Sequence, residues 1–204
     1  MRFDPARASS RDTYYTMIST IVPRPIAWVS TVDPAGRPNL APFSFFMGVT
    51  SRPPTLALAI GNKADGGPKD TARNAIDTGE LVVNVVPVAL AEAMVLTSGE
   101  YAHGESEFDL AQVETVPSER VRPPRVAQSP VQFECTVHQV VPLEDAGQVT
   151  SRLIIARIEL IHVDDAVLDA AGRVDPRRLD PLARLGGSHY ATLGDLQRHS
   201  RPKV

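Results

Sequence analysis

The feature that most limits how this chain can fold is a strict alternation of apolar and polar residues between positions 131 and 138. The apolar members are Val131, Phe133, Cys135 and Val137, and the polar members are Gln132, Glu134, Thr136 and His138. A period of two is that of a β-strand with one face in the core and the other in water. The chain is therefore expected to contain a sheet with one wet face.

Apolar runs and the turn residues between them predict the other elements. Strands are expected over residues 26–32, 39–49, 55–60, 81–86 and 153–163. The second of these should pair with the first as a hairpin, and the last is apolar enough to be buried on both faces. Helices are expected over residues 9–21, 68–78 and 87–96, the first with Ser9 as its cap and an apolar face of Tyr14, Met17, Ile18 and Ile21. Residues 99–129 form mostly a loop, which is either functional or a cover.

The order of these elements predicts a mainly β (α+β) fold in a single domain over residues 1–204. Strands come in neighbouring pairs joined by short turns, which favours antiparallel pairing. We expect a closed or nearly closed antiparallel β-barrel with a few covering helices. A doubly wound parallel sheet is the alternative, but it would need a helix after nearly every strand. The 18 prolines are spread between the apolar segments, so none of them marks a linker between domains.

Composition narrows the classes of function. The chain is 43% hydrophobic, a globular balance, and its net charge of −3 argues against a general nucleic-acid binder. Its one cysteine, Cys135, is expected to be a buried inert thiol rather than a redox centre. No apolar run reaches the roughly 18 residues of a membrane span, and the N-terminus is unlike a signal peptide. We therefore expect a cytoplasmic protein with no membrane partner. The basic segment 173–204 is either a solvated tail or a patch beside an anionic ligand or a partner subunit.

Several familiar chemical motifs are absent from the sequence. No G-x-G-x-x-G follows a strand, and no G-x-S-x-G elbow occurs. The glycine-rich segment 61–69 fails as a phosphate loop because Pro68 stands where a donating amide is needed. His103 with Glu105 and Glu107 suits a hard cation, but a solvated charged loop explains the same residues. No metal site is expected.

Small donor residues gather at the ends of predicted strands. They occur in Ser30-Thr31, in the segment 39–44 and in the segment 50–54. Lys69, Asp70 and Thr71 open a predicted helix, where free backbone amides, a hydroxyl and an ammonium group suit a monophosphate. The alternative is that Asp70 or Thr71 only caps that helix.

Taken together and in order, these segments resemble the flavin reductase-like family with an FMN-binding split barrel. The resemblance runs through roughly residues 20 to 190 and rests on the following segments: 24–31, 33–36, 39–46, 51–54, 69–74, 78–84, 123–131 and 182–187. It implies an antiparallel split β-barrel and a homodimer that binds FMN in a groove near the subunit interface.

The resemblance also implies roles for particular residues. The ring and ribityl chain of FMN would be lined by Ser30, Thr31, Asn39, Ala41 and Ser44. The phosphate would be held by Thr50, Ser51, Lys69 and Thr71, with Asp70 left as the helix cap. Trp28 and Phe43 are candidates to stack on the ring, with a place in the core as the alternative. Arg184, His189 and Tyr190 would lie near the flavin as catalytic residues, where Arg184 and His189 would help to dock an anionic or carbonyl-bearing substrate.

The expected function follows from that cofactor. FMN would take hydride from NADH or NADPH and pass electrons to free flavin, a metal complex or a small unsaturated substrate. A non-catalytic FMN-binding electron-transfer module that serves a partner protein is the alternative. A split barrel that has lost flavin and acts as a binding scaffold is a third reading.

Overall fold

A computed structural model describes residues 1–102 and 105–202 of the chain. The helices are α1 (Ser10–Thr20), α2 (Asp70–Thr78), α3 (Ala91–Leu96), α4 (Glu107–Leu110) and α5 (Pro176–Leu179), with short 3-10 turns at Val88–Leu90 and Asp165–Val167. The longer strands are β2 (Ala27–Val32), β3 (Pro38–Phe43), β4 (Phe46–Ser51), β5 (Pro54–Gly61), β6 (Glu80–Val85), β9 (Val131–Asp145) and β10 (Gln148–Val163). Two-residue strands are β1 (Arg24–Pro25), β7 (Thr115–Val116), β8 (Arg125–Val126), β11 (Ala183–Arg184) and β12 (Tyr190–Ala191).

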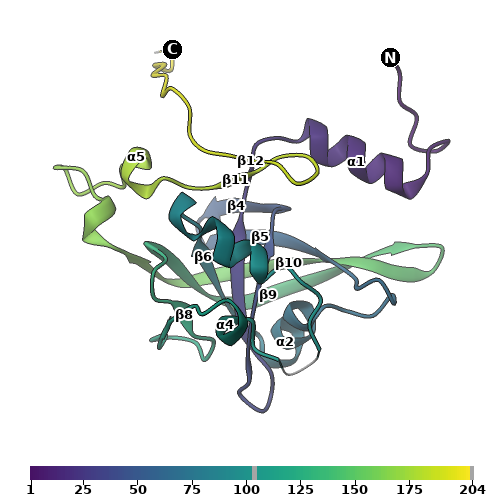
Figure 1. Cartoon of the computed structure of the whole chain (residues 1–204), viewed down its shortest axis with the longest axis horizontal. Coiled ribbons are helices and arrows are strands. Elements are labelled where there is room, and N and C mark those ends of the chain that lie inside the picture. The colour runs from purple at the N-terminus through teal and green to yellow at the C-terminus, as the bar shows by residue number, and fades with distance from the viewer. Residues whose placement is uncertain (103–104, 203–204) are drawn as a thin grey trace.

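One seven-stranded antiparallel sheet forms the body of the molecule, in the order β3-β2-β6-β9-β10-β5-β4. Only Ser44 and Phe45 separate β3 from β4, which stand at the two ends of this order, so the sheet curls back on itself. The Ala59 amide donates to the Phe45 carbonyl at 2.8 Å and extends the pairing of β4 with β5. The C-terminal segment and α1 lie together on one side of the sheet (Figure 1). The expected antiparallel split barrel is confirmed, and the parallel alternative is wrong.

The expected hairpin over 39–49 is wrong in its second half. β3 ends at Phe43, and the chain then crosses so that β4 pairs with β5 at the other end of the sheet. The partner strand β2 begins at Ala27, opposite Phe43, and is preceded by Pro25, which has no amide to donate. Beyond Phe43 the chain leaves β2 and pairs with β5 from Phe45 onward.

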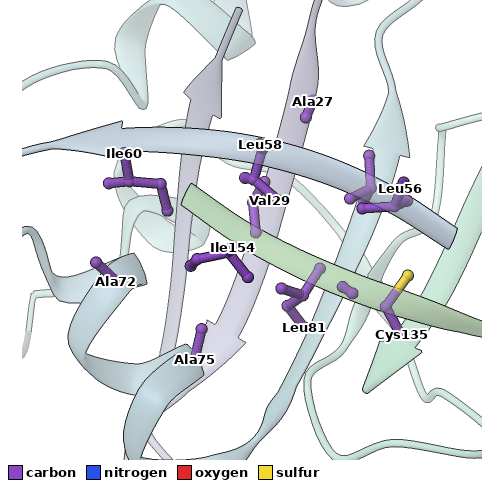
Figure 2. Close-up of a cluster of buried hydrophobic side chains, with 12 residues drawn as sticks. Ala27, Val29, Leu56, Leu58, Ile60, Ala72, Ala75, Leu81, Cys135 and Ile154 are labelled. Atoms are coloured by element: carbon purple, nitrogen blue, oxygen red, sulfur yellow. The ribbon is translucent and has the colours of Figure 1, made fainter. Parts of the chain in front are cut away.

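The barrel interior is a dry cluster built from five strands and α2. Val29, Leu58 and Ile154 converge between their strands, and Ala72 and Ala75 bring α2 close against them (Figure 2). Cys135 belongs to this cluster and is fully buried, and burial raises the pKa of its thiol. The prediction that Cys135 is buried is therefore confirmed, and its inertness stays a prediction.

A second apolar cluster lies on the opposite face of β2. Trp28 and Leu40 pack there against Met94 of α3 and Phe108 of α4. The described part of the segment 99–129 therefore acts as a cover, which was one of its two expected roles. Among the described residues, no helix is long and apolar enough to cross a membrane.

The wet face predicted for the strand 131–138 is partly wrong. Gln132 is 6% exposed and Glu134 is fully buried, because the segment 117–130 folds over that face. The Glu134 carboxylate accepts the amides of Glu119 at 2.9 Å and Arg120 at 2.6 Å. His162 of β10 also lies 2.6 Å from it. A polar side chain at an alternating position of a strand needs a hydrogen-bond partner, and that partner can be a protein group instead of water.

The strand expected over 153–163 is also less buried than its composition suggested. Ile154 and Ala156 are in the core, whereas Ile161 is 46% exposed. Helix α1 is capped by Ser9 as expected, but of its apolar face only Ile18 is buried. In both places the sequence shows which residues are apolar but does not show whether another segment of the chain buries them.

The buried Glu134 carboxylate predicts a pH-dependent contribution to stability. Burial alone would raise the pKa of Glu134, but the two backbone donors and His162 outweigh it and hold that pKa below its usual range. The stabilisation is then complete above the unfolded-state pKa of about 4.3 and is lost as the pH falls through the lower folded-state value. Glu134→Gln should reduce the free energy of unfolding by about 1–3 kcal/mol at neutral pH, and by less below about pH 4.

Urea denaturation at several pH values measures this difference. Glu144→Gln, on the exposed part of β9, is the matched control and should show no such loss. A Glu134→Gln deficit that stays the same between pH 7 and pH 3.5 would contradict the account.

Candidate functional site

Two hollows meet along β3 at the split of the barrel. The first, here called the lysine hollow, measures about 50 Å³, and its lining includes Asn39, Ala41, Phe43, Lys63, Lys69 and Thr71. The second, here called the arginine hollow, measures about 200 Å³, and its lining includes Tyr14, Arg24, Phe43, Ser44, Ser98 and Arg184. Pro42, Phe43 and Ser98 line both, so the two hollows are neighbours.

Asn39 is the centre of a buried polar cluster at the base of the lysine hollow. Its Nδ2 donates to both carboxylate oxygens of Glu107 at 2.9 Å, and the Leu40 amide donates to Glu107 Oε2 at 2.9 Å. Because a carboxylate only accepts here, the amide nitrogen of Asn39 must face Glu107. Its Oδ1 therefore faces Thr71, whose hydroxyl donates to it at 3.0 Å. Thr31 lies in the same cluster, 3.4 Å from Asn39 Oδ1.

Helix α2 begins at the edge of the lysine hollow. Lys69 is its N-cap residue, and the Lys69 side chain makes no capping hydrogen bond to the first-turn amides. Asp70 instead pairs with Lys63 at 2.8 Å and with Arg73 at 2.9 Å, so the expected capping role of Asp70 or Thr71 is wrong. Free amides and the positive end of the helix dipole remain beside Lys69, which is an arrangement that attracts anions.

Arg24 is buried at the back of the arginine hollow, with 4% of its surface exposed. Its Nη1 donates to the carbonyls of Ile18 at 2.6 Å and Ile21 at 2.8 Å, at the end of α1. Its Nη2 donates to the Leu185 carbonyl at 2.9 Å, and its Nε donates to Ser44 Oγ at 3.2 Å. Burial lowers the pKa of the Arg24 guanidinium, with Tyr14 acting against this and Arg184 adding to it.

Arg184 lies at the mouth of the same hollow. Its Cζ is 4.4 Å from the centre of the Tyr190 ring, and its Nη2 donates to the Gly187 carbonyl. Tyr190 packs against the second apolar cluster. His189 is exposed, and its ring lies against the Gly186 carbonyl at 3.2 Å. Of the three residues expected to be catalytic, Arg184 alone lines a hollow in the described structure.

Two of the expected cofactor contacts, Trp28 and Ser30, lie apart from both hollows. Trp28 is fully buried in the second apolar cluster and donates from Nε1 to Thr97 Oγ1 at 2.8 Å. Ser30 is equally buried, and its hydroxyl donates to the Pro124 carbonyl. Because side chains alternate along a strand, these two residues face away from Thr31. Their contact with FMN stays a prediction.

Thr50 and Ser51 are also separated from the other phosphate candidates. Thr50 pairs with Thr55 at the start of β5, whereas Pro68, next to Lys69, bridges to Asn62 just past the end of that strand. At about 3.3 Å per residue, the length of β5 places the two groups about 20 Å apart. The four-residue phosphate clamp is therefore not assembled within one chain, whereas Asn39, Ala41, Phe43, Lys69 and Thr71 do share one hollow.

Two central residues of this site, Glu107 and Arg24, were not among those predicted from the sequence. Glu107 was considered only as a cation ligand, yet it is the acceptor that orients Asn39. His103, its proposed companion, lies outside the described residues, and among those described no group of side chains could hold a metal. The position of Arg24 just after a predicted helix could have identified it, because a cation there can bind the last carbonyls of that helix.

Comparison with known proteins places this geometry in a family. A family model, "Flavin reductase like domain", matches residues 18–186. The uncharacterized protein BH2278 of Halalkalibacterium halodurans is 37% identical over 100% of this chain and 98% of that protein. The structure of nitrilotriacetate monooxygenase component B from Bacillus cereus is similar with a TM-score of 0.93 and 32% identity over 98% of both chains. The Pseudomonas fluorescens 2-nitrobenzoate 2-nitroreductase NbaA is similar with a TM-score of 0.86 and 26% identity over 99% of this chain and 96% of that one.

The matched residues contain the whole seven-stranded sheet, the α2 N-terminus, Arg24 and Arg184. The residues that line both hollows are thus part of the matched domain, except Tyr14 of the arginine hollow, which precedes it. This chain belongs to the flavin reductase-like domain family.

Proposed function

We propose that this protein is an FMN-dependent oxidoreductase that takes electrons from NADH or NADPH. The acceptor would be free flavin, a metal complex or a small unsaturated molecule. The observation that carries the proposal is the pair of hollows meeting at Phe43, one reaching the uncapped start of α2 and the other reaching two arginines. An elongated molecule with an anionic end and a planar ring matches such a pair.

The residues of the lysine hollow fit such a molecule. Lys69 and the first amides of α2 would hold the phosphate, because they combine a positive charge with free donors. Asn39, Ala41 and Thr71 would line the ribityl chain. Phe43, at the junction of the hollows, would lie beside the ring and keep water from it.

When bound, FMN supplies hydride acceptance and electron transfer, so the protein needs no acid–base triad of its own. The contribution of the chain is binding, orientation and charge. Arg184 places a positive group at the ring end of the site, where it would stabilise negative charge that develops on reduction. The similarity to a 2-nitrobenzoate 2-nitroreductase supports a reductive activity, and the similarity to a nitrilotriacetate monooxygenase component supports oxidoreductase chemistry.

Reduction of bound FMN is the direct test of this function. Purified protein loaded with FMN should lose the visible absorbance of its oxidised flavin on adding NADH or NADPH without oxygen, because the nicotinamide reduces the flavin. Stopped-flow absorbance measures the rate. Bleaching by dithionite but by neither nicotinamide would contradict the reductase and favour the electron-transfer module. Failure to bind FMN would contradict both.

The phosphate position is tested by Lys69→Met, which keeps much of the apolar stem and removes the charge. FMN affinity should fall by about 1.5–3 kcal/mol, since one charge-assisted hydrogen bond is lost. Riboflavin, which lacks the phosphate, is the ligand control, and its affinity should stay unchanged. Fluorescence quenching of each flavin measures both constants, and an equal loss for the two would place the phosphate elsewhere.

We further propose that the protein works as a homodimer. Large apolar side chains are exposed on α1 and β4, among them Tyr14 (52%), Ile21 (51%), Met47 (58%) and Val49 (49%). The two elements meet at Arg24, which bonds the end of α1 and lies 5.8 Å from the Phe45 ring. The hollows of one chain are smaller than the roughly 300–1,000 Å³ of typical ligand pockets, so a second copy would supply the missing wall.

Light scattering should therefore give twice the 22.1 kDa mass of one chain. Met47→Glu with Val49→Glu should shift the protein to the monomer and weaken FMN binding, because charge is placed in the apolar contact. Replacement of exposed Leu143 by Glu, on the β9–β10 hairpin, is the control. A wild-type protein that is monomeric would contradict the proposal.

A further inference from the structure

Glu107 is a buried acid beside the lysine hollow. It is 9% exposed, and in the described part of the chain no Lys, Arg or His side chain forms an ion pair with it. Its carboxylate accepts hydrogen bonds from the side-chain amide of Asn39 and the backbone amide of Leu40, which are neutral donors. Burial of such a charge costs stability, because neutral donors only partly replace its hydration. The contact with Asn39 shows what the charge does.

The hydrogen bonds that lead from Thr71 to Glu107 all point the same way. The Thr71 hydroxyl donates to Asn39 Oδ1 at 3.0 Å, and Asn39 Nδ2 donates to both carboxylate oxygens at 2.9 Å. A reversed Asn39 amide would set its carbonyl oxygen against the carboxylate, so the charge of Glu107 fixes the direction. A neutral glutamine of the same shape would not fix it, because it presents an NH₂ group as well as an oxygen.

Thr71 ends this series of hydrogen bonds and lines the lysine hollow. Its proton is directed to Asn39, and among residues 1–102 and 105–202 no group donates a hydrogen bond to Thr71 Oγ1. The lone pairs of that oxygen are therefore left for a donor in the hollow. Under the proposed function the ribityl chain of the flavin runs past Asn39 and Thr71, and its hydroxyl groups can donate there.

We propose that Glu107 is the positioning residue through which the lysine hollow recognises the ribityl hydroxyls of a flavin. This inference rests on the proposed function. Glu107 acts through Asn39 and Thr71, because the Thr71 oxygen accepts a ligand hydroxyl only while the Thr71 proton stays on the side of Asn39. Binding of the flavin ring does not depend on Glu107.

Riboflavin and lumiflavin are the probes, because they share the ring and lumiflavin carries a methyl group in place of the ribityl chain. Fluorescence quenching should show the wild-type protein binding riboflavin at least about tenfold more tightly. Glu107→Gln should lower that preference to less than about threefold, because only the affinity for riboflavin falls. Glu100→Gln is the matched control and should keep the full preference, since exposed Glu100 lines the same hollow without a hydrogen bond to Asn39 in the described structure.

Thr71→Val separates positioning from a merely structural role. It removes the oxygen on which Glu107 acts, so the riboflavin preference should fall as it does in Glu107→Gln. Adding Glu107→Gln to Thr71→Val should then change the preference by less than about twofold, because the two residues act in one series. Effects that multiply in the double variant would contradict the proposed link.

A riboflavin preference that survives Glu107→Gln, or that Glu100→Gln also removes, would overturn the proposal. An equal loss of both flavins in Glu107→Gln would also overturn it, because Glu107 would then have only a structural role. Equal binding of the two probes by the wild-type protein would overturn this inference and leave the proposed function standing. Wild-type protein that binds neither probe nor FMN would overturn the proposed function, and this inference with it.

Discussion

The arrangement of the site depends on one buried cation, Arg24. Its guanidinium joins the last turn of α1, the crossover residue Ser44 and the carbonyl of Leu185, which are parts of the chain far apart in sequence. Each acceptor is neutral, so the charge is stabilised by carbonyl dipoles and the burial penalty is only partly offset. The fold tolerates this because the same contacts fix the walls of a hollow at the split of the barrel.

The split itself follows from strand pairing. β3 loses its partner after Phe43, and the chain crosses to begin β4 at the far end of the sheet. An open edge remains where a closed barrel would have paired strands, and that edge is where both hollows lie. The glycine-free turn at Ser44 and Phe45 therefore lies where the two hollows meet, and Ser44 accepts a hydrogen bond from Arg24 there.

Periodicity in the sequence was enough to predict most of the elements. The cap at Ser9, the helix ending at Gly79 and the antiparallel order were all predictable, because each depends on neighbours along the chain. Burial was less predictable, since it depends on segments distant in sequence. Glu134 alternates like a wet residue but lies beneath the segment 117–130, and Ile161 is apolar yet half exposed.

The same limit applies to the site. Lys69, Thr71 and Asn39 line one hollow as a helix start and a turn suggested, and their contact with FMN stays a prediction. Trp28 and Ser30 lie apart from the hollows, because the alternation of β2 shows two faces without showing which one meets a ligand. Thr50 and Ser51 lie apart from Lys69, because a family pattern gives the order of segments along the chain and does not show where a strand changes its partner. No pattern around Glu107 in the sequence predicts its role, because that role depends on the contact of α4 with Asn39 in the folded chain.

The contact between Glu107 and Asn39 has a consequence for ligand chemistry. By taking the amide hydrogens of Asn39, Glu107 leaves only the oxygen for Thr71, and the Thr71 proton is spent on that oxygen. Any group that meets Thr71 from the hollow finds a lone pair and must bring its own hydrogen. An alcohol satisfies this condition and a fully ionised oxyanion does not, so the Glu107 carboxylate at the start of α4 selects ligand atoms by whether they carry a proton.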